Sequence, residues 1–370
     1  MHGTLEADTF RMSRQKTYII AEAGVNHNGS LDMARELIDV AVEAGADAVK
    51  FQTFRADTLA LPTAPKAAYQ EATTGSGESQ REMLRRLELG PKEHEALMAH
   101  CQACGIQFLS TPFDVESLEL LVQQLGMPRV KIPSGEITNG PFLFAAASTG
   151  LPLILSTGMS TLGEVEEALG VIAYGYIRPP APPGSAAFSA AQASDEGQEA
   201  LRERVTLLHC TSEYPTPPQD VHLRAMDTLR SAFGLAVGYS DHTKGFAVPI
   251  AAVARGATLV EKHFTLDRTL KGPDHRASME PAELAEMVRA IREVEAALGR
   301  GVKAPTVGEL ETRAVARKSL VAAAAIQAGE LLSPENLVAR RPGTGISPMR
   351  YWERLGCPAA RAFQPDEPLT

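Results

Sequence analysis

The chain contains 370 residues, of which 44% are hydrophobic and 22% are charged, and its formal net charge is -9. These values are typical of a soluble globular enzyme, and the excess of acidic residues argues against nucleic acid as a partner. No apolar run approaches the roughly 20 residues that a membrane-spanning helix needs, so we expect no membrane partner.

The cysteines and the first residues indicate a cellular compartment. Cys101, Cys104, Cys210 and Cys357 are too few to form a disulfide framework in a chain of this length. The first residues lack the apolar segment of a secretory signal. We therefore expect a cytoplasmic protein.

Short apolar runs rich in β-branched residues alternate with longer amphipathic stretches over the first 300 residues. We expect strands over residues 18–24, 48–53, 106–111, 129–134, 152–157, 205–210, 235–240 and 258–264. This alternation predicts βα units and a parallel sheet, and eight such units match the size of a (β/α)8 TIM barrel. A doubly wound open sheet is the alternative, but no glycine-rich phosphate-binding fingerprint follows any of the strands.

Two segments interrupt this rhythm. Residues 54–90 form a polar insertion, which we expect to be a lid or a loop with short helices. Residues 176–200 are rich in Pro, Ala and Ser, and this composition predicts a mobile surface excursion.

The periodicity changes after the barrel, which we assign to residues 1–300. Residues 301–315 are expected to be a linker or linking helix, and residues 316–370 a small separate domain. Within it we expect a strand at 319–326, a turn at 327–330 and a helix capped by Ser333, with Pro334 at its first position. So short a tail is too small for a large core, which predicts docking onto a barrel.

Polar residues collect at the ends of the expected strands, where TIM barrels place their active sites. They include Glu22, Lys50, Gln52, Thr111, Lys131, Ser134, Glu136, Ser156, Ser212, Tyr214, Ser240, His242, Glu261 and His263. Burying an unpaired charge costs several kcal/mol, so this set implies mutual pairing or a charged ligand. Lysines with many hydroxyl groups suit an anion that carries phosphate and carboxylate, although any single Ser or Thr could equally be a strand-end cap.

Two histidines are candidate metal ligands. His242 and His263 end neighbouring expected strands, and Asp241 and Glu261 flank them. Two imidazoles with water and substrate oxygens would suit a divalent transition ion such as Mn²⁺, with Mg²⁺ or Co²⁺ as alternatives. A single histidine at a strand end is more often structural, so the pair carries the hypothesis.

Several segments together resemble the sialic acid synthase family. They are IIAEAGVNHNGS, AVKFQT, STPFD, KIPSGEITN, LSTGMST, LLHCTSEYPTP, GYSDHT and VEKHFTLD followed by GPDHRASMEP. The tail, ARKSLVAAAAIQAGELLSPENLVARRPGTGI, is similar to the antifreeze-like (SAF) domain of that family, a small β-clip fold. The resemblance implies an enzyme that joins phosphoenolpyruvate (PEP) to N-acetylmannosamine or a related N-acetylated sugar aldehyde. It also implies a domain-swapped homodimer in which each SAF domain caps the partner's barrel.

The same resemblance assigns roles to individual residues. PEP would be held by Lys50, Thr111, Lys131, Ser134, Ser156 and Ser240, and Glu22 would lie near the reacting water. The sugar would be lined by Gln52, Glu136, Tyr214 and Asp274, while Arg341 would reach a partner's site to hold the N-acetyl group. His242 and His263 would bind the metal. Relatives that use N-acetylmannosamine often carry Asn where this chain has Ser212, which keeps legionaminic-type acid synthesis open as the alternative.

Rival hypotheses come from isolated features. Lys131 or Lys50 could form an imine with pyruvate, as in a Schiff-base aldolase, and the tail alone could suggest a carbohydrate-binding or ice-binding protein. His100, Cys101 and Cys104 invite a zinc or redox site, but their helical spacing is more typical of core residues. The Asn28-Gly-Ser30 glycosylation pattern is more simply a turn and a helix cap.

Overall fold

The computed structural model describes residues 16–370 and divides them into two units, one ending at Gly299 and the other running from Arg300 to Thr370. No helix of the described chain is both long enough and apolar enough to cross a bilayer. The candidate site lies in the first unit.

All eight expected strands form, each within two residues of its expected bounds. They are β1 (Tyr18–Gly24), β2 (Ala48–Thr53), β3 (Gln107–Pro112), β4 (Val130–Ile132), β5 (Leu153–Ser156), β6 (Val205–Cys210), β7 (Ala236–Asp241) and β8 (Leu259–His263). Every pairing is parallel, in the order β3-β2-β1-β8-β7-β6-β5-β4, and β3 and β4 contact each other. The predicted TIM barrel is therefore confirmed.

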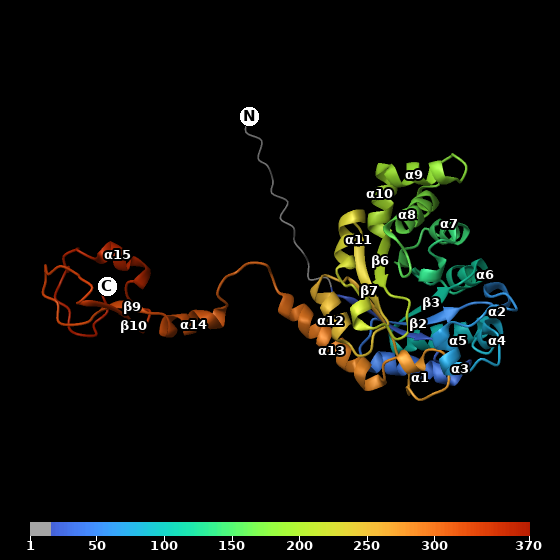
Figure 1. Cartoon of the computed structure of the whole chain (residues 1–370), viewed down its shortest axis with the longest axis horizontal. Helices are drawn as coiled ribbons and strands as arrows, with labels where there is room; N and C mark the ends of the chain where they lie inside the picture. Colours follow the sequence, from blue (N-terminus) through green and yellow to red (C-terminus); the bar gives the residue numbers. More distant parts are fainter. Residues whose placement is uncertain (1–15) are drawn as a thin grey trace. The chain divides into compact units, whose positions relative to one another are not determined.

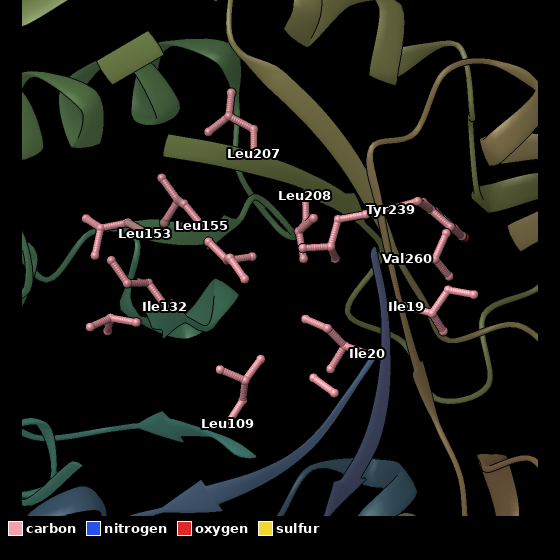
Figure 2. Packing of buried hydrophobic residues seen from close by; sticks show 14 of the residues in the cluster. Ile19, Ile20, Leu109, Ile132, Leu153, Leu155, Leu207, Leu208, Tyr239 and Val260 are labelled. Atoms are coloured by element: carbon pink, nitrogen blue, oxygen red, sulfur yellow. The ribbon is translucent and has the colours of Figure 1, made fainter. Parts of the chain in front are cut away.

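The strands are apolar because helices cover one face of the sheet and the barrel interior covers the other. Figure 2 shows Ile19, Ile20, Leu109, Ile132 and Leu208 among the buried residues of this core. Since neighbouring side chains on a strand point to opposite faces, Ile20 shares its face with Glu22. Polar site residues therefore continue the same inward-facing rows that fill the barrel below them.

Helices follow most strands and surround the barrel (Figure 1). In the first unit they are α1 (Leu31–Glu43), α2 (Ala56–Leu59), α3 (Ala68–Thr74), α4 (Gln80–Arg85), α5 (Pro91–Cys104), α6 (Val115–Glu119), α7 (Gly140–Ser148), α8 (Leu162–Ile177), α9 (Ser185–Ala193), α10 (Asp195–Arg204), α11 (Ala225–Phe233), α12 (Ala247–Ala254) and α13 (Pro281–Leu298). Ser30 caps α1 by accepting a hydrogen bond from the Met33 amide at 3.3 Å, as the capping interpretation of the glycosylation pattern predicted.

The two interrupting segments behave differently. The insertion at 54–90 contains the short helices α2, α3 and α4, as predicted. The surface excursion expected at 176–200 contains regular structure, because most of that segment forms α9 and the start of α10. Alanine is a strong helix former, and Gly170 of α8 leaves room for the Phe188 carbonyl of α9 to approach closely. Ala191 and Leu201 are buried as a result.

The second unit is built from α14 (Val307–Ala316), β9 (Ser319–Ala322), β10 (Leu337–Arg340) and α15 (Tyr351–Arg354). The antiparallel pair β9-β10 and a small apolar cluster that includes Leu320, Ile326 and Phe363 hold it together. The linking helix is confirmed as α14, but the helix expected after Ser333 is wrong. The amides of Asn336 and Leu337 both reach the Ser333 carbonyl, which makes a single turn that leads directly into β10.

Candidate active site

A cavity of about 430 Å³ lies at the carboxyl ends of the barrel strands. Its lining includes every predicted site residue of the first unit: Glu22, Lys50, Gln52, Thr111, Lys131, Ser134, Glu136, Ser156, Ser212, Tyr214, Ser240, His242, His263 and Asp274. Positions that are up to 252 residues apart in the chain, such as Glu22 and Asp274, thus share one chamber. Arg341, the remaining predicted site residue, belongs to the second unit.

Four charged side chains form the floor of this cavity. Lys50 forms an ion pair with Glu22, and its Nζ lies 3.7 Å from Glu261 Oε2. Lys131 reaches Glu261 from the far side of the barrel, with Nζ and Oε1 3.1 Å apart. Strand register explains the assembly, because Glu22 stands beside Lys50 on β2 and beside His263 on β8. All four side chains are almost completely buried.

Burial and neighbouring charges shift the pKa values of the Glu22 and Glu261 carboxyl groups in opposite directions. Burial raises the pKa of Glu22 to about 7, and the neighbouring Glu261 charge adds to this although the Lys50 ammonium opposes it. Burial also acts on Glu261, but the ammonium groups of Lys131 and Lys50 outweigh it and hold the pKa of Glu261 at about 2. Glu261 is therefore a permanent counter-ion, whereas Glu22 can exchange a proton near neutral pH. Such a separation is typical of acid–base assignments in active sites.

Hydroxyl and thiol groups surround this charged floor. Lys50 Nζ donates to Thr111 Oγ1 at 2.8 Å, and Ser240 Oγ donates to Glu261 Oε1 at 3.0 Å. Ser134 Oγ accepts from the Gly158 amide at 3.0 Å. The buried Ser156 hydroxyl has no hydrogen-bond partner among the described residues. Buried hydroxyl groups are normally satisfied, so Ser156 offers a free donor to a bound anion.

Gly158 makes this side of the cavity possible. A Cβ atom at this position would lie 2.4 Å from Ser212 Oγ, 2.8 Å from Ser134 Oγ and 3.0 Å from Cys210 Sγ. Only glycine admits all three side chains at such close approach. The strand-end glycine therefore belongs to the site although it has no side chain.

The two candidate metal ligands lie together. The rings of His242 and His263 are 5.6 Å apart, and Tyr214 packs against both, 4.1 Å from His242 and 5.7 Å from His263. His242 Nδ1 is hydrogen-bonded to the Thr211 carbonyl at 2.6 Å, which leaves Nε2 for a ligand. His263 Nδ1 is buried without a partner among the described residues.

Both imidazoles are in the form that binds metals. Burial lowers the pKa of His242, and burial together with the neighbouring His242 lowers that of His263 well below its usual range. Two neutral imidazoles, each with a ring nitrogen that makes no hydrogen bond within the described residues, suit a divalent ion. Asp241, the carboxylate that flanks His242 in the sequence, forms an ion pair with Lys262 at 2.6 Å.

Three further polar groups line the cavity, namely Gln52, Glu136 and Asp274. Gln52 Nε2 donates to Glu22 Oε1 at 3.4 Å, and Glu136 Oε2 accepts from Asn139 at 2.6 Å. Burial raises the pKa of Asp274 to about 6. Arg341, in the second unit, is exposed and has no ion-pair partner within the described part of the chain. Its predicted role in a partner's site stays a prediction.

Two kinds of site residue were incompletely predicted. Glu261 was predicted among the strand-end polar residues and as a carboxylate beside His263, but without a role of its own, and it is the carboxylate that both lysines share. Its period-two spacing from His263 was the available signal. Tyr69 and Gln70 line the cavity from the insertion, and no sequence pattern marked them as site residues. The composition of a polar loop does not predict where the loop lies in the fold.

The His100–Cys104 segment lies on α5, outside the cavity. Cys101 is buried in the core, as the helical interpretation predicted. Asp39, His100 and Cys104 are the one group of three potential metal ligands found together within residues 16–370. The 2.7 Å hydrogen bond between His100 Nε2 and Asp39 Oδ1 at this partly exposed surface accounts for their proximity without an ion.

The fold and the cavity define a class of protein, namely a TIM-barrel enzyme whose cavity floor is built from paired buried lysines and carboxylates. Within that class the chain belongs to the NeuB family, whose model matches residues 37–303. Residues 317–370 match the SAF domain. The predicted family resemblance is thereby confirmed.

Individual relatives agree with this assignment. The chain is 48% identical to an N,N'-diacetyllegionaminic acid synthase of Campylobacter jejuni, over 95% of this chain and 98% of the relative. It is 47% identical to the enzyme of the same name from Legionella pneumophila, over 94% and 91% of the two chains. A solved N-acetylneuraminic acid synthetase from Leptospira borgpetersenii, crystallised with citrate, is 35% identical with a TM-score of 0.65, covering 81% of this chain and 90% of that one.

Proposed function

We propose that this enzyme condenses PEP with a 2,4-diacetamido-trideoxy-hexose and water to give a legionaminic-type acid and phosphate. The choice of sugar is supported by the two relatives named as N,N'-diacetyllegionaminic acid synthases. Ser212, where N-acetylmannosamine-using relatives were expected to carry Asn, is compatible with this choice. N-acetylmannosamine, with N-acetylneuraminate as product, is the second candidate.

The observation that carries the proposal is the buried cluster of Lys50, Lys131, Glu22 and Glu261. PEP carries a carboxylate and a phosphate, which need two cationic partners in a site shielded from water. Lys50 and Lys131 lie on opposite sides of Glu261 and can each face one anionic group. The unpaired Ser156 hydroxyl supplies a directed donor beside them.

The chain's own groups can perform the remaining steps. Once the PEP methylene carbon attacks the aldehyde carbon, positive charge develops on the phosphate-bearing carbon, which Glu261 stabilises as a fixed anion. Water adds to that carbon, and Glu22 takes its proton because the pKa of Glu22 is close to neutral. The resulting adduct loses phosphate by carbon–oxygen cleavage as its new hydroxyl gives up a proton and becomes the ketone. The alkoxide formed from the aldehyde oxygen takes up the proton that Glu22 received. No lysine imine is required, in contrast to a Schiff-base aldolase.

A divalent metal, most simply Mn²⁺, would be held by His242 and His263. When bound, such an ion polarises an aldehyde oxygen as a Lewis acid. Tyr214 fixes both rings by packing against them, which limits their motion when no ligand is present. Their unprotonated state near neutral pH supports this assignment.

We further propose a homodimer in which Arg341 of one subunit contacts the N-acetyl group bound in the other. A guanidinium offers several rigid donors to an amide carbonyl and stays charged throughout. The exposed position of Arg341 is compatible with this role. The four cysteines, all free, support a reducing cytoplasm as the location.

Phosphate release tests the proposal. Enzyme, PEP and Mn²⁺ should release inorganic phosphate only when a suitable sugar is added, and 2,4-diacetamido-2,4,6-trideoxymannose should be used better than N-acetylmannosamine. Borohydride with pyruvate should trap no covalent adduct. Trapping of an adduct on Lys131 or Lys50, or an absence of sugar-dependent phosphate release, would overturn the proposal.

A further inference from the structure

The insertion between β2 and α5 supplies one wall of the cavity. Its lining residues include Leu59 of α2, Tyr69 and Gln70 of α3, and Gln80, Met83 and Leu84 of α4, with Phe54 and Leu87 at its ends. None of them carries a charge. This wall therefore differs from the cavity floor, where the lysines and carboxylates gather.

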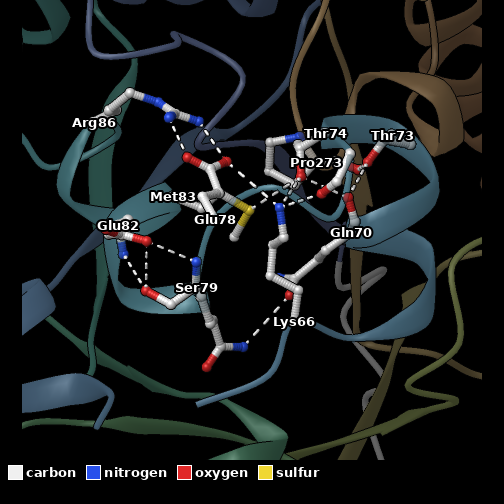
Figure 3. A network of polar contacts seen from close by, with 12 residues as sticks. Lys66, Gln70, Thr73, Thr74, Glu78, Ser79, Glu82, Met83, Arg86 and Pro273 are labelled. Atoms are coloured by element: carbon white, nitrogen blue, oxygen red, sulfur yellow. Dashed lines mark hydrogen bonds and ion pairs between the residues drawn. The ribbon is translucent and has the colours of Figure 1, made fainter. Parts of the chain in front are cut away.

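A buried lysine fixes the wall in place. The Lys66 side chain is 1% exposed, its Nζ donates to Thr74 Oγ1 at 3.0 Å and to the Gly75 carbonyl, and it lies 3.5 Å from Glu78 Oε1. Figure 3 shows this network, in which Arg86 binds the same Glu78 carboxylate from the outside. Because Lys66 is fully engaged, its charge is not free for a ligand.

The wall also joins the far side of the cavity. Thr73 Oγ1 donates to the Pro273 carbonyl at 3.4 Å, which ties α3 to the loop that carries Asp274 (Figure 3). The Tyr69 ring stacks on Tyr214 at 4.9 Å, with an angle of 27° between the planes. Since Tyr214 itself packs on His242, Tyr69 stands one ring further from the histidines.

From this geometry we propose that Tyr69, Gln70 and Leu84 form a subsite for the end of the sugar opposite its reacting aldehyde. This subsite takes a neutral end with a deoxygenated carbon and an acetamido group, and it rejects a hexose phosphate. The inference rests on the proposed function, which places the aldehyde near His242 and His263.

The chemistry of the wall matches such a ligand. The Tyr69 ring and the Leu84 side chain offer apolar surface to a methyl group. Gln70 Oε1 accepts from the Ala67 amide at 3.0 Å and from Gln80 Nε2 at 3.4 Å, and Gln70 Nε2 donates to Tyr69 Oη at 3.4 Å. The second N–H of Gln70 therefore remains as a donor to the carbonyl of an acetamido group. Aromatic faces and a few placed polar groups are the usual makeup of small-molecule sites.

The same wall offers nothing to a phosphate. A phosphate monoester carries close to two negative charges at neutral pH and needs cationic or amide donors. Among the described residues that line the cavity, the lysines are Lys50 and Lys131, and Glu22 and Glu261 hold them at the floor. The other carboxyls that line the cavity are those of Glu136 and Asp274, which repel an anion.

The wild-type enzyme gives the first test. Sugar-dependent phosphate release is measured with 2,4-diacetamido-2,4,6-trideoxymannose, N-acetylmannosamine and N-acetylmannosamine 6-phosphate. The diacetamido sugar should have the highest kcat/KM, and the 6-phosphate should be used at least a hundredfold less well than its unphosphorylated form. Comparable use of the two N-acetylmannosamine forms would overturn the inference while leaving the proposed condensation intact.

Variants locate the effect. Tyr69→Ala should raise the KM for the diacetamido sugar about tenfold, as expected for the loss of a stacked aromatic contact, and leave the KM for PEP unchanged. Tyr69→Phe, which keeps the stack, should stay within about threefold of wild type. Glu71→Ala on the exposed face of α3 is the matched control. Equal loss of affinity for PEP and sugar, or no loss at all in a folded Tyr69→Ala protein, would contradict the subsite.

The two proposals can fail separately. If no sugar in the panel elicits phosphate release from PEP, the proposed function is wrong and the subsite falls with it. If release occurs but Tyr69→Ala and Gln70→Ala do not change the preference among sugars, only the subsite is wrong. Circular dichroism of each variant confirms folding, and Tyr69→Leu replaces Tyr69→Ala if the latter does not fold.

Discussion

Removing Lys131 should weaken PEP binding by an amount that the floor of the cavity lets us bound. Its Nζ lies 3.1 Å from Glu261 Oε1, and both side chains are 5% exposed. Truncating one member of a buried, hydrogen-bonded charge pair costs about 2–5 kcal/mol. In Lys131→Ala, Glu261 would keep Lys50 and Ser240 as partners. We therefore expect the lower part of this range, about 2–3 kcal/mol, or roughly a 30- to 150-fold rise in the KM for PEP.

The assay is phosphate release at saturating sugar and varied PEP. The exposed Lys92→Ala on α5 removes the same charge outside the cavity and should leave the KM for PEP unchanged. Thermal unfolding monitored by circular dichroism shows whether Lys131→Ala is folded. A folded variant with wild-type affinity for PEP would refute both the anion site and the assignment of Lys131 to it.

Further predictions concern the base, the metal and the assembly. Since Glu22 must be unprotonated to accept a proton and its pKa is about 7, kcat/KM should rise with pH through about 7. Glu22→Gln should lower kcat at least tenfold, keep the KM for PEP within threefold and abolish this rise of kcat/KM with pH. A rise that persists in the variant would exclude Glu22 as the base. EDTA should abolish activity and Mn²⁺ restore it, while His263→Ala should weaken Mn²⁺ binding measured by electron paramagnetic resonance; full activity of metal-free enzyme would exclude the metal. Inactive Arg341→Ala and His263→Ala dimers should regain activity when they are mixed, toward about a quarter of wild type after subunit exchange, because each heterodimer would contain one intact site. Heterodimers that stay inactive would mean that Arg341 acts within its own subunit.

The barrel was predictable because its signal is local and repeated. A run such as YIIAEAG at 18–24 can be recognised as a buried strand from its own residues, and its polar end then falls at the active-site face. The helices α9 and α10 were missed because the Pro-rich segment that precedes them hid a run of helix-forming alanines. Likewise, Ser333-Pro334 can begin either a turn or a helix, and the strand that follows decided for the turn.

The site was only partly predictable for a different reason. The strand-end rule places Lys131 and Glu261 in one chamber, but their contact spans 130 residues and depends on side chains that cross the barrel. The pKa values of Glu22 and Glu261 are shifted in opposite directions because different lysines contact the two carboxylates. No sequence pattern shows which lysine contacts which carboxylate. The position of Tyr69 depends on Lys66 and Glu78, whose burial inside a polar loop is equally invisible in the sequence.

Gly158 limits how this enzyme's specificity can be redesigned. Because the space beside it is already filled by Ser212, Ser134 and Cys210, we expect a larger side chain at position 212, such as asparagine, to turn away from Gly158 and toward the cavity. We therefore expect a single substitution at position 212 to crowd the cavity and not to change which sugar is preferred. Laboratory evolution toward a different sugar should need a paired change at 134 or 210, so the accessible mutational routes pass through double rather than single substitutions.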